Sequence, residues 1–439
     1  MPRKIWIALS GLMAIASCGG SGSHNGPPVA GTKSIAAFYL ASPPVTGTIN
    51  EAAHTIQLEL YGADVTSLTP TIIHTGASIS PASGMTRDFS RPLAYTVTAA
   101  DGTTQEYSVS VVPPARGKTM RVSGESLVLA ATLPGKLSFD RLTSGSVMIR
   151  STYLANDPGG IAYQEGVDFT VDYPNGTIAR TMSSRIPDFS TNILYGQHDF
   201  DQNNFPGFTN HPFFIWVDYE TSNGEDFAKP NDQARYLTGA RAKLAAGGPF
   251  RIVSFGDSIT AGREASTPDL GFRALYRNHL QSLFPGSTIV LEDVSLPGYT
   301  SKLAIASWNA TVGTTSPDLV LLGWGMNDHS LGGDTPEQFK QNLITLVGMI
   351  RDQKHAEVIL FSAFPPNEEW HYGTHRMNLY AEATRQAAAE SSCAYVNVFE
   401  TWGMVLQRKD QPSLLGNNIN HPNDFGHWMY LQAFTALNF

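Results

Sequence analysis

The hydrophobic period changes in the second half of the chain, and this change limits the possible folds more than any other sequence feature. Beyond residues 245–249, short apolar runs alternate with segments of helical period; the runs are residues 251–255, 288–294, 318–322, 358–363 and 394–398. The clearest helix start is Thr335-Pro336, because Thr caps helices well and Pro is favoured at their first position. Strict alternation of strands and helices predicts a parallel sheet covered on both faces. Such sheets bind ligands beyond the carboxyl ends of their strands.

Residues 33–113 have the period of two that is typical of half-buried strands. Ile56, Leu58 and Leu60 alternate with polar residues, and Asp101-Gly102 separates two later runs of the same kind, which predicts a hairpin turn. The segment has no cluster of His, Cys or carboxylates in a catalytic arrangement. We predict an immunoglobulin-like β-sandwich that acts as a spacer or binding module.

Residues 118–245 are also rich in strand patterns. Asn175-Gly176 marks a hairpin, and residues 213–217 form an apolar run that suits a buried strand. We predict a second, jelly-roll-like β-sandwich. Four aromatic side chains could line a sugar-binding face, but we favour core packing or a loop that covers the next domain; they are Phe200, Phe205, Phe208 and Phe213.

The N-terminus has the pattern of an export signal. Arg3 and Lys4 precede an apolar run over residues 5–16 that is short for a membrane span. The run ends at Ile15-Ala16-Ser17-Cys18, which resembles a bacterial lipobox. We predict a signal peptide over residues 1–18, lipidation of Cys18 and a flexible tether over residues 19–32. The expected location is the bacterial cell envelope, lipid-anchored at the periplasmic face or the cell surface.

The charge of the chain argues against nucleic-acid binding, and its cysteine content argues against a catalytic cysteine. The 439 residues carry a formal net charge of -9 with no cluster of Lys and Arg, which argues against a nucleic-acid partner. Without Cys18, Cys393 is the one remaining cysteine, so no disulfide forms within the mature chain. We interpret Cys393 as a small buried apolar residue rather than a nucleophile.

Short polar motifs follow the predicted strands of residues 249–439. Gly256-Asp257-Ser258 comes directly after the first strand, Gly325-Met326-Asn327-Asp328 follows the third, and His421-Pro422-Asn423-Asp424 lies near the C-terminus. Together with Gly298 they resemble, in this order, the four blocks of the SGNH (GDSL-type) hydrolase superfamily. The resemblance implies a flavodoxin-like α/β domain over residues 249–439. The expected fold is therefore multidomain, with two all-β sandwich modules before this domain.

The resemblance assigns a role to each block. Ser258 would be the nucleophile, at a strand-to-helix turn where the helix N-terminus favours developing negative charge. Its backbone N–H, the N–H of Gly298 and the side-chain amide of Asn327 would form the oxyanion hole. His421 would accept the Ser258 proton and return it to the leaving alcohol.

The sequence departs from the family pattern at one position. The family usually has Asp three residues before the histidine, and this chain has Asn418. Three accounts of how His421 is oriented are open: the amide oxygen of Asn418, a backbone carbonyl, or a carboxylate from elsewhere such as Asp424. We favour a Ser-His dyad with a neutral orienting acceptor.

Other polar residues receive structural interpretations. Asp257 supports the turn through hydrogen bonds, and His427 packs within the last helix. His371 and His375 have a spacing that could form half of a zinc site, but the order of a zinc motif is missing and Gly373 interrupts the segment. We therefore predict no metal and no organic cofactor.

The predicted reaction is ester hydrolysis through an acyl-enzyme. Resemblance to multidomain SGNH enzymes with β-sandwich attachments suggests that the substrate is an O-acetylated polysaccharide or oligosaccharide. A lipid or aryl esterase is the alternative within the same chemistry. A non-catalytic glycan-binding lipoprotein is the alternative from another class.

Overall fold

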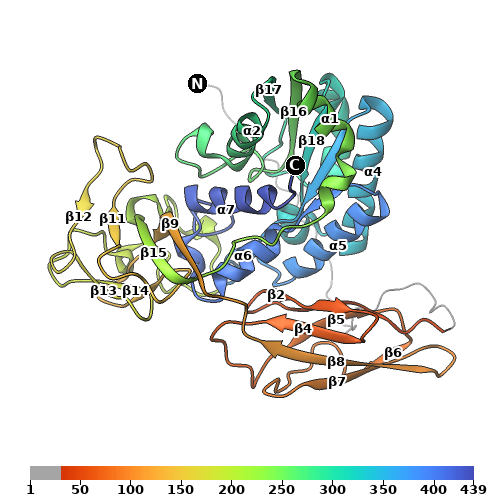
Figure 1. The fold of residues 1–439 in the computed structure, drawn as a ribbon, viewed down its shortest axis with the longest axis horizontal. Helices are drawn as coiled ribbons and strands as arrows, with labels where there is room; N and C mark the ends of the chain where they lie inside the picture. Colours follow the sequence, from red (N-terminus) through yellow and green to blue (C-terminus); the bar gives the residue numbers. More distant parts are fainter. Residues whose placement is uncertain (1–30) are drawn as a thin grey trace.

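The computed structural model describes residues 31–439 (Figure 1). The predicted signal peptide, Cys18 and most of the predicted tether lie outside the described residues. Three parts follow in chain order: an N-terminal β module, a middle β region and a C-terminal α/β domain. Within residues 31–439, no helix combines the length and apolar character needed to cross a membrane.

Two sheets form the N-terminal module, and they enclose a core of their own. One sheet has the order β2-β1-β5 and the other β3-β4-β8-β7-β6. The buried side chains of Phe38, Tyr95 and Tyr107 lie between the sheets. The predicted hairpin at Asp101-Gly102 joins β7 to β8. The bounds of these strands are β1 Ile35–Leu40, β2 Val45–Thr46, β3 Thr48–Asn50, β4 Thr55–Glu59, β5 Pro70–His74, β6 Ser78–Ser80, β7 Leu93–Thr98 and β8 Thr104–Val112.

The middle region also contains two sheets, with the orders β12-β11-β15-β9 and β10-β14-β13. The predicted hairpin at Asn175-Gly176 joins β13 to β14. The strands are β9 Lys118–Leu127, β10 Gly135–Lys136, β11 Met148–Arg150, β12 Ala162–Tyr163, β13 Phe169–Asp172, β14 Thr177–Arg180 and β15 Ile215–Gly224.

The middle region shares its hydrophobic core with the α/β domain. The buried side chains of the middle region form one continuous hydrophobic cluster with those of the α/β domain. Both ends of β15 are buried, because the region packs on the α/β domain as well as on itself. Helix α1 (Thr238–Ala246), which we had placed at the end of the sandwich, packs against the first strands of the α/β domain.

The α/β domain has the predicted parallel sheet, with the strand order β17-β16-β18-β19-β20. Numbered within the domain this order is 2-1-3-4-5, which is the flavodoxin-like arrangement. Helices α2 and α7 pack together on one side of the sheet and α3, α4 and α5 on the other (Figure 1). The strands are β16 Gly248–Gly256, β17 Ser287–Asp293, β18 Leu319–Gly323, β19 Glu357–Phe361 and β20 Ala394–Val396; the helices are α2 Phe272–Leu283, α3 Ser301–Ala306, α4 Pro336–Lys354, α5 Met377–Glu390, α6 Val398–Leu406 and α7 Asp424–Thr435.

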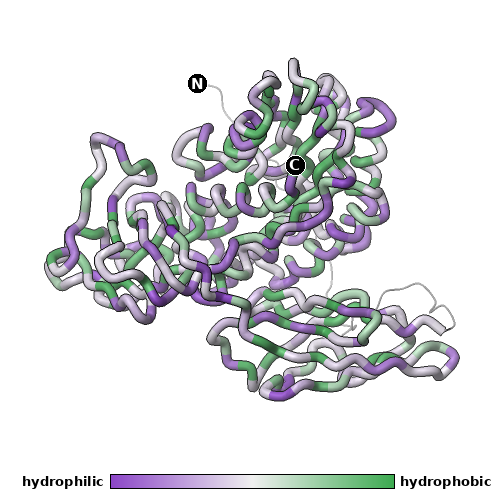
Figure 2. Tube along the Cα trace, in the orientation of Figure 1, coloured by the Kyte–Doolittle hydropathy of each residue, from purple (hydrophilic) through white to green (hydrophobic). Residues whose placement is uncertain are grey.

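Local sequence explains why these elements form. Every residue of β18 is buried, as expected for a central strand with helices on both faces, and the middle strands carry the hydrophobic colour in Figure 2. Helix α4 begins with the predicted cap, where the Thr335 hydroxyl accepts from the Gln338 N–H and the Gln338 side chain accepts from the Thr335 N–H.

All three parts meet at one polar junction. The Tyr61 hydroxyl of the N-terminal module donates a hydrogen bond to Asp140 of the middle region. Arg408 of the α/β domain pairs with the same carboxylate at 3.0 Å, and the Arg116 guanidinium lies 3.8 Å from the centre of the Tyr61 ring. A Cβ at Gly403 would collide with a backbone carbonyl of the N-terminal module. These contacts join the N-terminal module to the middle region and to the α/β domain.

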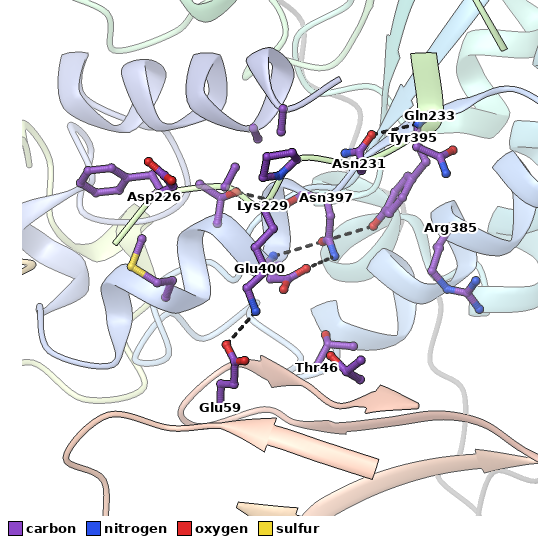
Figure 3. A pocket seen from close by; sticks show the side chains of 18 of the residues that line it. Thr46, Glu59, Asp226, Lys229, Asn231, Gln233, Arg385, Tyr395, Asn397 and Glu400 are labelled. Carbon is purple, nitrogen blue, oxygen red and sulfur yellow. Dashed lines mark hydrogen bonds and ion pairs between the residues drawn. The ribbon is translucent and has the colours of Figure 1, made fainter. Parts of the chain in front are cut away.

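A cavity of about 500 Å³ lies beside this junction, between the N-terminal module and helices α5 and α6 (Figure 3). Its charged side chains are paired with neighbours. Lys229 Nζ lies 2.7 Å from Glu59 Oε2, and the Asn397 amide donates to Glu400 at 2.9 Å. We interpret the cavity as a space left where the domains meet. Neither Ser258 nor His421 lines it.

Candidate active site

Ser258 and His421 meet at the carboxyl end of the central strands. Ser258 follows β16, and His421 lies in the loop before α7. Their atoms Oγ and Nε2 are 2.8 Å apart, which is hydrogen-bond distance. Ser258 is 8% exposed, so little of its surface is open to solvent. The sequence motifs had predicted this pair although 162 residues separate its members along the chain.

The segment after Ser258 differs from our expectation. Residues 258–264 form irregular turns, and the next helix, α2, begins only at Phe272. The Ala261 N–H donates to the Asp257 carbonyl at 3.0 Å, and the Arg263 N–H donates to the Ser258 carbonyl at 3.0 Å. A helix dipole is therefore not available beside the nucleophile. The local polarity comes from the N–H groups of the turn.

Asp257 supports this turn, as expected. Its Oδ1 accepts the Ile259 N–H at 2.9 Å, and the side chain is buried. Burial raises the pKa of Asp257 to about 7, although backbone hydrogen bonds oppose the shift, and the nearby Asp328 carboxylate raises the pKa further. The group is a buried structural carboxyl and makes no contact with His421 among the described hydrogen bonds.

Gly298 and Asn327 come from the two loops on either side of Ser258. The Leu296 N–H donates to the Gly256 carbonyl at 2.7 Å, which fixes the Gly298 loop beside the end of β16. Gly298 has a φ of +81°, and a side chain there would be strained. Within residues 31–439, the N–H groups of Ser258 and Gly298 have no hydrogen-bond acceptor. These N–H groups are therefore free to bind an anion.

Asn327 is buried at the same edge of the sheet. Its Nδ2 donates to the Tyr299 carbonyl at 2.9 Å, which leaves the second amide hydrogen for a ligand. Asp328 holds the two loops together, because its carboxylate accepts the N–H groups of Ser301 at 2.9 Å and Gly325 at 3.1 Å. Since β16 lies between β17 and β18, this edge is the point of the sheet where loops diverge to opposite faces.

Asn417, which the sequence analysis did not consider, contacts the other ring nitrogen of His421. Asn417 Nδ2 lies 2.9 Å from His421 Nδ1. Asn417 Oδ1 accepts three backbone N–H groups, from Ile419, Asn420 and His421, each at 3.0 Å. Burial lowers the pKa of His421 to about 4, so the imidazole is neutral at pH 7; Glu264 opposes this shift.

Asn418 and Asp424, the two side chains that the sequence analysis considered for orienting His421, have other partners in the structure. Asn418 has a left-handed φ of +56°, and this turn directs its side chain to Asn210, whose Nδ2 lies 3.1 Å from Asn418 Oδ1. Asp424 begins α7 and accepts the Ser266 N–H at 2.8 Å. Neither side chain makes a hydrogen bond to His421 among the described residues.

The middle region supports the loop that carries His421. Asn210 is fully buried, and its Nδ2 also lies 3.0 Å from the Leu415 carbonyl. The Asn210 N–H donates to the Gly416 carbonyl at 2.8 Å, and the Ser126 hydroxyl donates to the Ser413 carbonyl at 2.5 Å. The sequence gives no local signal for these contacts, because the residues are about 200 positions or more from the loop.

The remaining sequence candidates have structural surroundings. His427 is fully buried in α7, and Cys393 is buried, with its pKa raised to about 12 by burial. His371 is half exposed and lies 2.9 Å from Asp199. No group of residues within 31–439 has the arrangement of a metal site. Phe200, Phe205 and Phe208 pack on the α/β domain, as favoured above, because they share a small hydrophobic cluster with Trp370.

The α/β domain thus combines a flavodoxin-like sheet with a Ser258–His421 contact at the carboxyl ends of its strands. Residues 254–429, within the α/β domain, match the GDSL-like lipase/acylhydrolase family. Residues 35–111 match the SGBP, N-terminal family, which covers the N-terminal module. No curated protein matches the chain.

Several solved structures are similar to the chain. A two-domain esterase (CEX) active on acetylated mannans is 20% identical with a TM-score of 0.40, and the match covers 48% of this chain and 54% of that one. Axe2, an acetylxylan esterase from Geobacillus stearothermophilus, is 23% identical with a TM-score of 0.39, covering 44% and 97%. LAE5, an α/β hydrolase enzyme from the metagenome of Lake Arreo, Spain, is 25% identical with a TM-score of 0.37, covering 45% and 98%. The match thus spans about half the length of the two-domain esterase.

Proposed function

We propose that the protein is a serine esterase that removes acetyl groups from O-acetylated carbohydrate through an acyl-enzyme on Ser258. The observation that carries the proposal is the 2.8 Å contact between Ser258 Oγ and His421 Nε2, beside N–H groups that have no acceptor within the described residues.

The proposed reaction uses these groups in two halves. Ser258 Oγ attacks the ester carbonyl carbon while its proton passes to His421 Nε2, and the N–H groups of Ser258 and Gly298 with the Asn327 amide bind the oxyanion. Each such donor is worth roughly 3 kcal/mol of barrier. The C–O bond then breaks, and His421 returns the proton to the alcohol. Water repeats the sequence on the acyl-serine, which releases the carboxylic acid and restores Ser258.

Two features support a small acyl group on a carbohydrate. Ser258 is 8% exposed, and a nucleophile with so little exposed surface favours a small acyl group such as acetyl. Residues 35–111 match the SGBP, N-terminal family, and we propose that this module binds glycan; the Tyr61 junction joins it to the rest of the protein. A fixed module that holds a polymer would keep its acetyl groups near Ser258 at a raised local concentration.

The test compares acetate release from acetylated xylan and acetylated mannan with hydrolysis of p-nitrophenyl esters from acetate to laurate. We expect acetate release from at least one polymer, a preference for acetate among the model esters, and no turnover by Ser258→Ala. A preference for long acyl chains without polymer deacetylation would show a lipid or aryl esterase. Glycan binding without any turnover would show a non-catalytic binding protein.

We also propose that Cys18 is lipidated and anchors the protein to the bacterial cell envelope. The support is the sequence Ile15-Ala16-Ser17-Cys18 after an apolar run. Expression in a bacterial host should place the wild type in the membrane fraction, and Cys18→Ser should release the protein or block its processing. A soluble mature protein that begins after another residue would contradict the proposal.

A further inference from the structure

The orientation of the Asn417 amide is fixed by its own hydrogen bonds. Oδ1 accepts the N–H groups of Ile419, Asn420 and His421, each at 3.0 Å. The opposite orientation of the amide would place the NH₂ hydrogens against three N–H donors. Such a flip would lose three hydrogen bonds and bring the partial positive charges of N–H hydrogens together. The NH₂ group therefore faces His421.

This orientation determines which nitrogen of His421 carries the proton. The Asn417 NH₂ group can only donate, and Nδ1 lies 2.9 Å from it, so Nδ1 must offer a lone pair. A neutral imidazole has one N–H, which then lies on Nε2 and points at Ser258 Oγ, 2.8 Å away. In this state Ser258 accepts a hydrogen bond from His421, whereas a general base needs the reverse.

We propose that Asn417 is the positioning residue of His421 and that it holds the resting imidazole in the Nε2–H tautomer. The inference rests on the proposed esterase function. Before the serine attacks, the Nε2 proton must leave to solvent while Nδ1 gains one, and the Asn417 amide must withdraw from Nδ1. Nε2 then accepts the Ser258 proton, and His421 becomes an imidazolium. Asn417 thus makes this unfavourable proton shift part of every acylation.

The charged surroundings of His421 do not replace an acceptor at Nδ1. Glu264, in the turn after β16, favours a protonated imidazole, but its carboxylate is held by His211 at 2.7 Å. Arg263, from the same turn, disfavours the imidazolium, and His427 of α7 is a further ionisable group near His421. Because Asn417 is the side chain in contact with Nδ1, a change at Asn417 should alter which nitrogen of His421 carries the proton.

The two neighbouring asparagines provide a matched pair of variants. Asn417→Asp keeps the oxygen that accepts three N–H groups and places a second carboxylate oxygen against Nδ1, which would then carry the proton. Asn418→Asp adds the same charge one residue away, but that side chain is directed at Asn210. The family pattern alone would predict that Asn418→Asp raises the esterase activity, whereas the contacts in the structure predict that Asn417→Asp does. The two variants therefore distinguish these predictions.

The activity measurement is kcat/KM for p-nitrophenyl acetate from pH 4 to pH 10. We expect Asn417→Asp to raise kcat/KM at pH 7 by at least about tenfold, towards the roughly 10⁴-fold that a tautomer-correcting carboxylate provides in a serine protease. The acidic limb should also move to higher pH, because a carboxylate stabilises the imidazolium. Asn418→Asp should give no such gain and no such displacement. Equal gains in both variants, or none in Asn417→Asp when it is folded, would overturn the proposal.

A second measurement reports the tautomer itself and does not depend on activity. The ¹⁵N chemical shifts of His421 in the wild type, assigned with His421→Gln, report which ring nitrogen is protonated at pH 7. We expect protonated Nε2 in the wild type. A protonated Nδ1 in the wild type would overturn the proposal outright. Protonated Nε2 in a protein without any esterase activity, even as Asn417→Asp, would instead reject the proposed function and leave the tautomer assignment standing.

Discussion

The buried ion pair between Glu125 and Lys409 should be among the most costly interactions to break in the protein. Glu125 lies on β9 and Lys409 follows α6, so the pair joins the middle region to the α/β domain. Both side chains are 0% exposed, and Lys409 Nζ lies 3.1 Å from Glu125 Oε1 without a well-aligned hydrogen bond. The same carboxylate accepts the Ser138 N–H at 2.8 Å and the Tyr219 hydroxyl at 2.7 Å.

Glu125→Ala would leave the Lys409 ammonium buried without a counter-charge and would remove both hydrogen bonds. Breaking a buried pair in this way costs about 3–5 kcal/mol of unfolding free energy. Replacing both partners by apolar residues, as in Glu125→Leu with Lys409→Met, should cost less, because no charge remains buried even though the Ser138 N–H and the Tyr219 hydroxyl also lose their acceptor. Urea unfolding followed by tryptophan fluorescence measures the wild type, Glu125→Ala and the double variant.

The refuting result is a loss below about 1 kcal/mol for Glu125→Ala, the range of an exposed ion pair. That result would mean that water reaches Lys409 and that the middle region and the α/β domain separate more easily than their common core implies.

Three further predictions concern the active-site loop and its supports. Because the pKa of His421 is lowered to about 4, kcat/KM should hold down to about pH 5 and fall near pH 4; a fall centred near pH 6.5 would indicate an exposed imidazole. The pKa of Asp257 is raised to about 7 in the folded state, so its contribution to stability is complete below about pH 4 and is lost as the pH rises through about 7. Asp257→Asn should flatten this fall in urea midpoints between pH 4 and pH 8, and an unchanged pH profile would contradict the burial argument. Asn210→Ala should lower kcat about tenfold with little change in KM, because it loosens the His421 loop without touching substrate; an unchanged kcat would show that the loop is held without Asn210.

Much of the α/β domain could be predicted because its signals are local. The five apolar runs became β16 to β20, and Thr335-Pro336 begins α4 as its capping residues require. Ser258 and His421 could be paired because each belongs to a motif that resembles a block of the same family. The turn after Ser258 was mistaken for the start of a helix, because the same residues favour either form until tertiary contacts decide.

The partner of His421 could not be found by counting positions. Asn418 occupies the family's usual position, yet its left-handed backbone turns its side chain to Asn210 and leaves Asn417 against the ring. Asn adopts this conformation more readily than most residues, so Asn417-Asn418 was a weak signal of a tight turn. The common core of the middle region and the α/β domain depends on contacts between distant segments, which a period of two along one strand does not reveal.

The central claim is that Ser258 is the nucleophile of an esterase, and covalent labelling tests it most directly. Wild-type protein is treated with a serine-directed fluorophosphonate, digested and mapped by mass spectrometry, while residual hydrolysis of p-nitrophenyl acetate is followed in parallel. The account predicts one adduct, on the peptide that contains Ser258, formed in step with the loss of hydrolysis and missing in Ser258→Ala. An adduct on another residue that tracks the loss of activity, or unchanged turnover by Ser258→Ala, would contradict it.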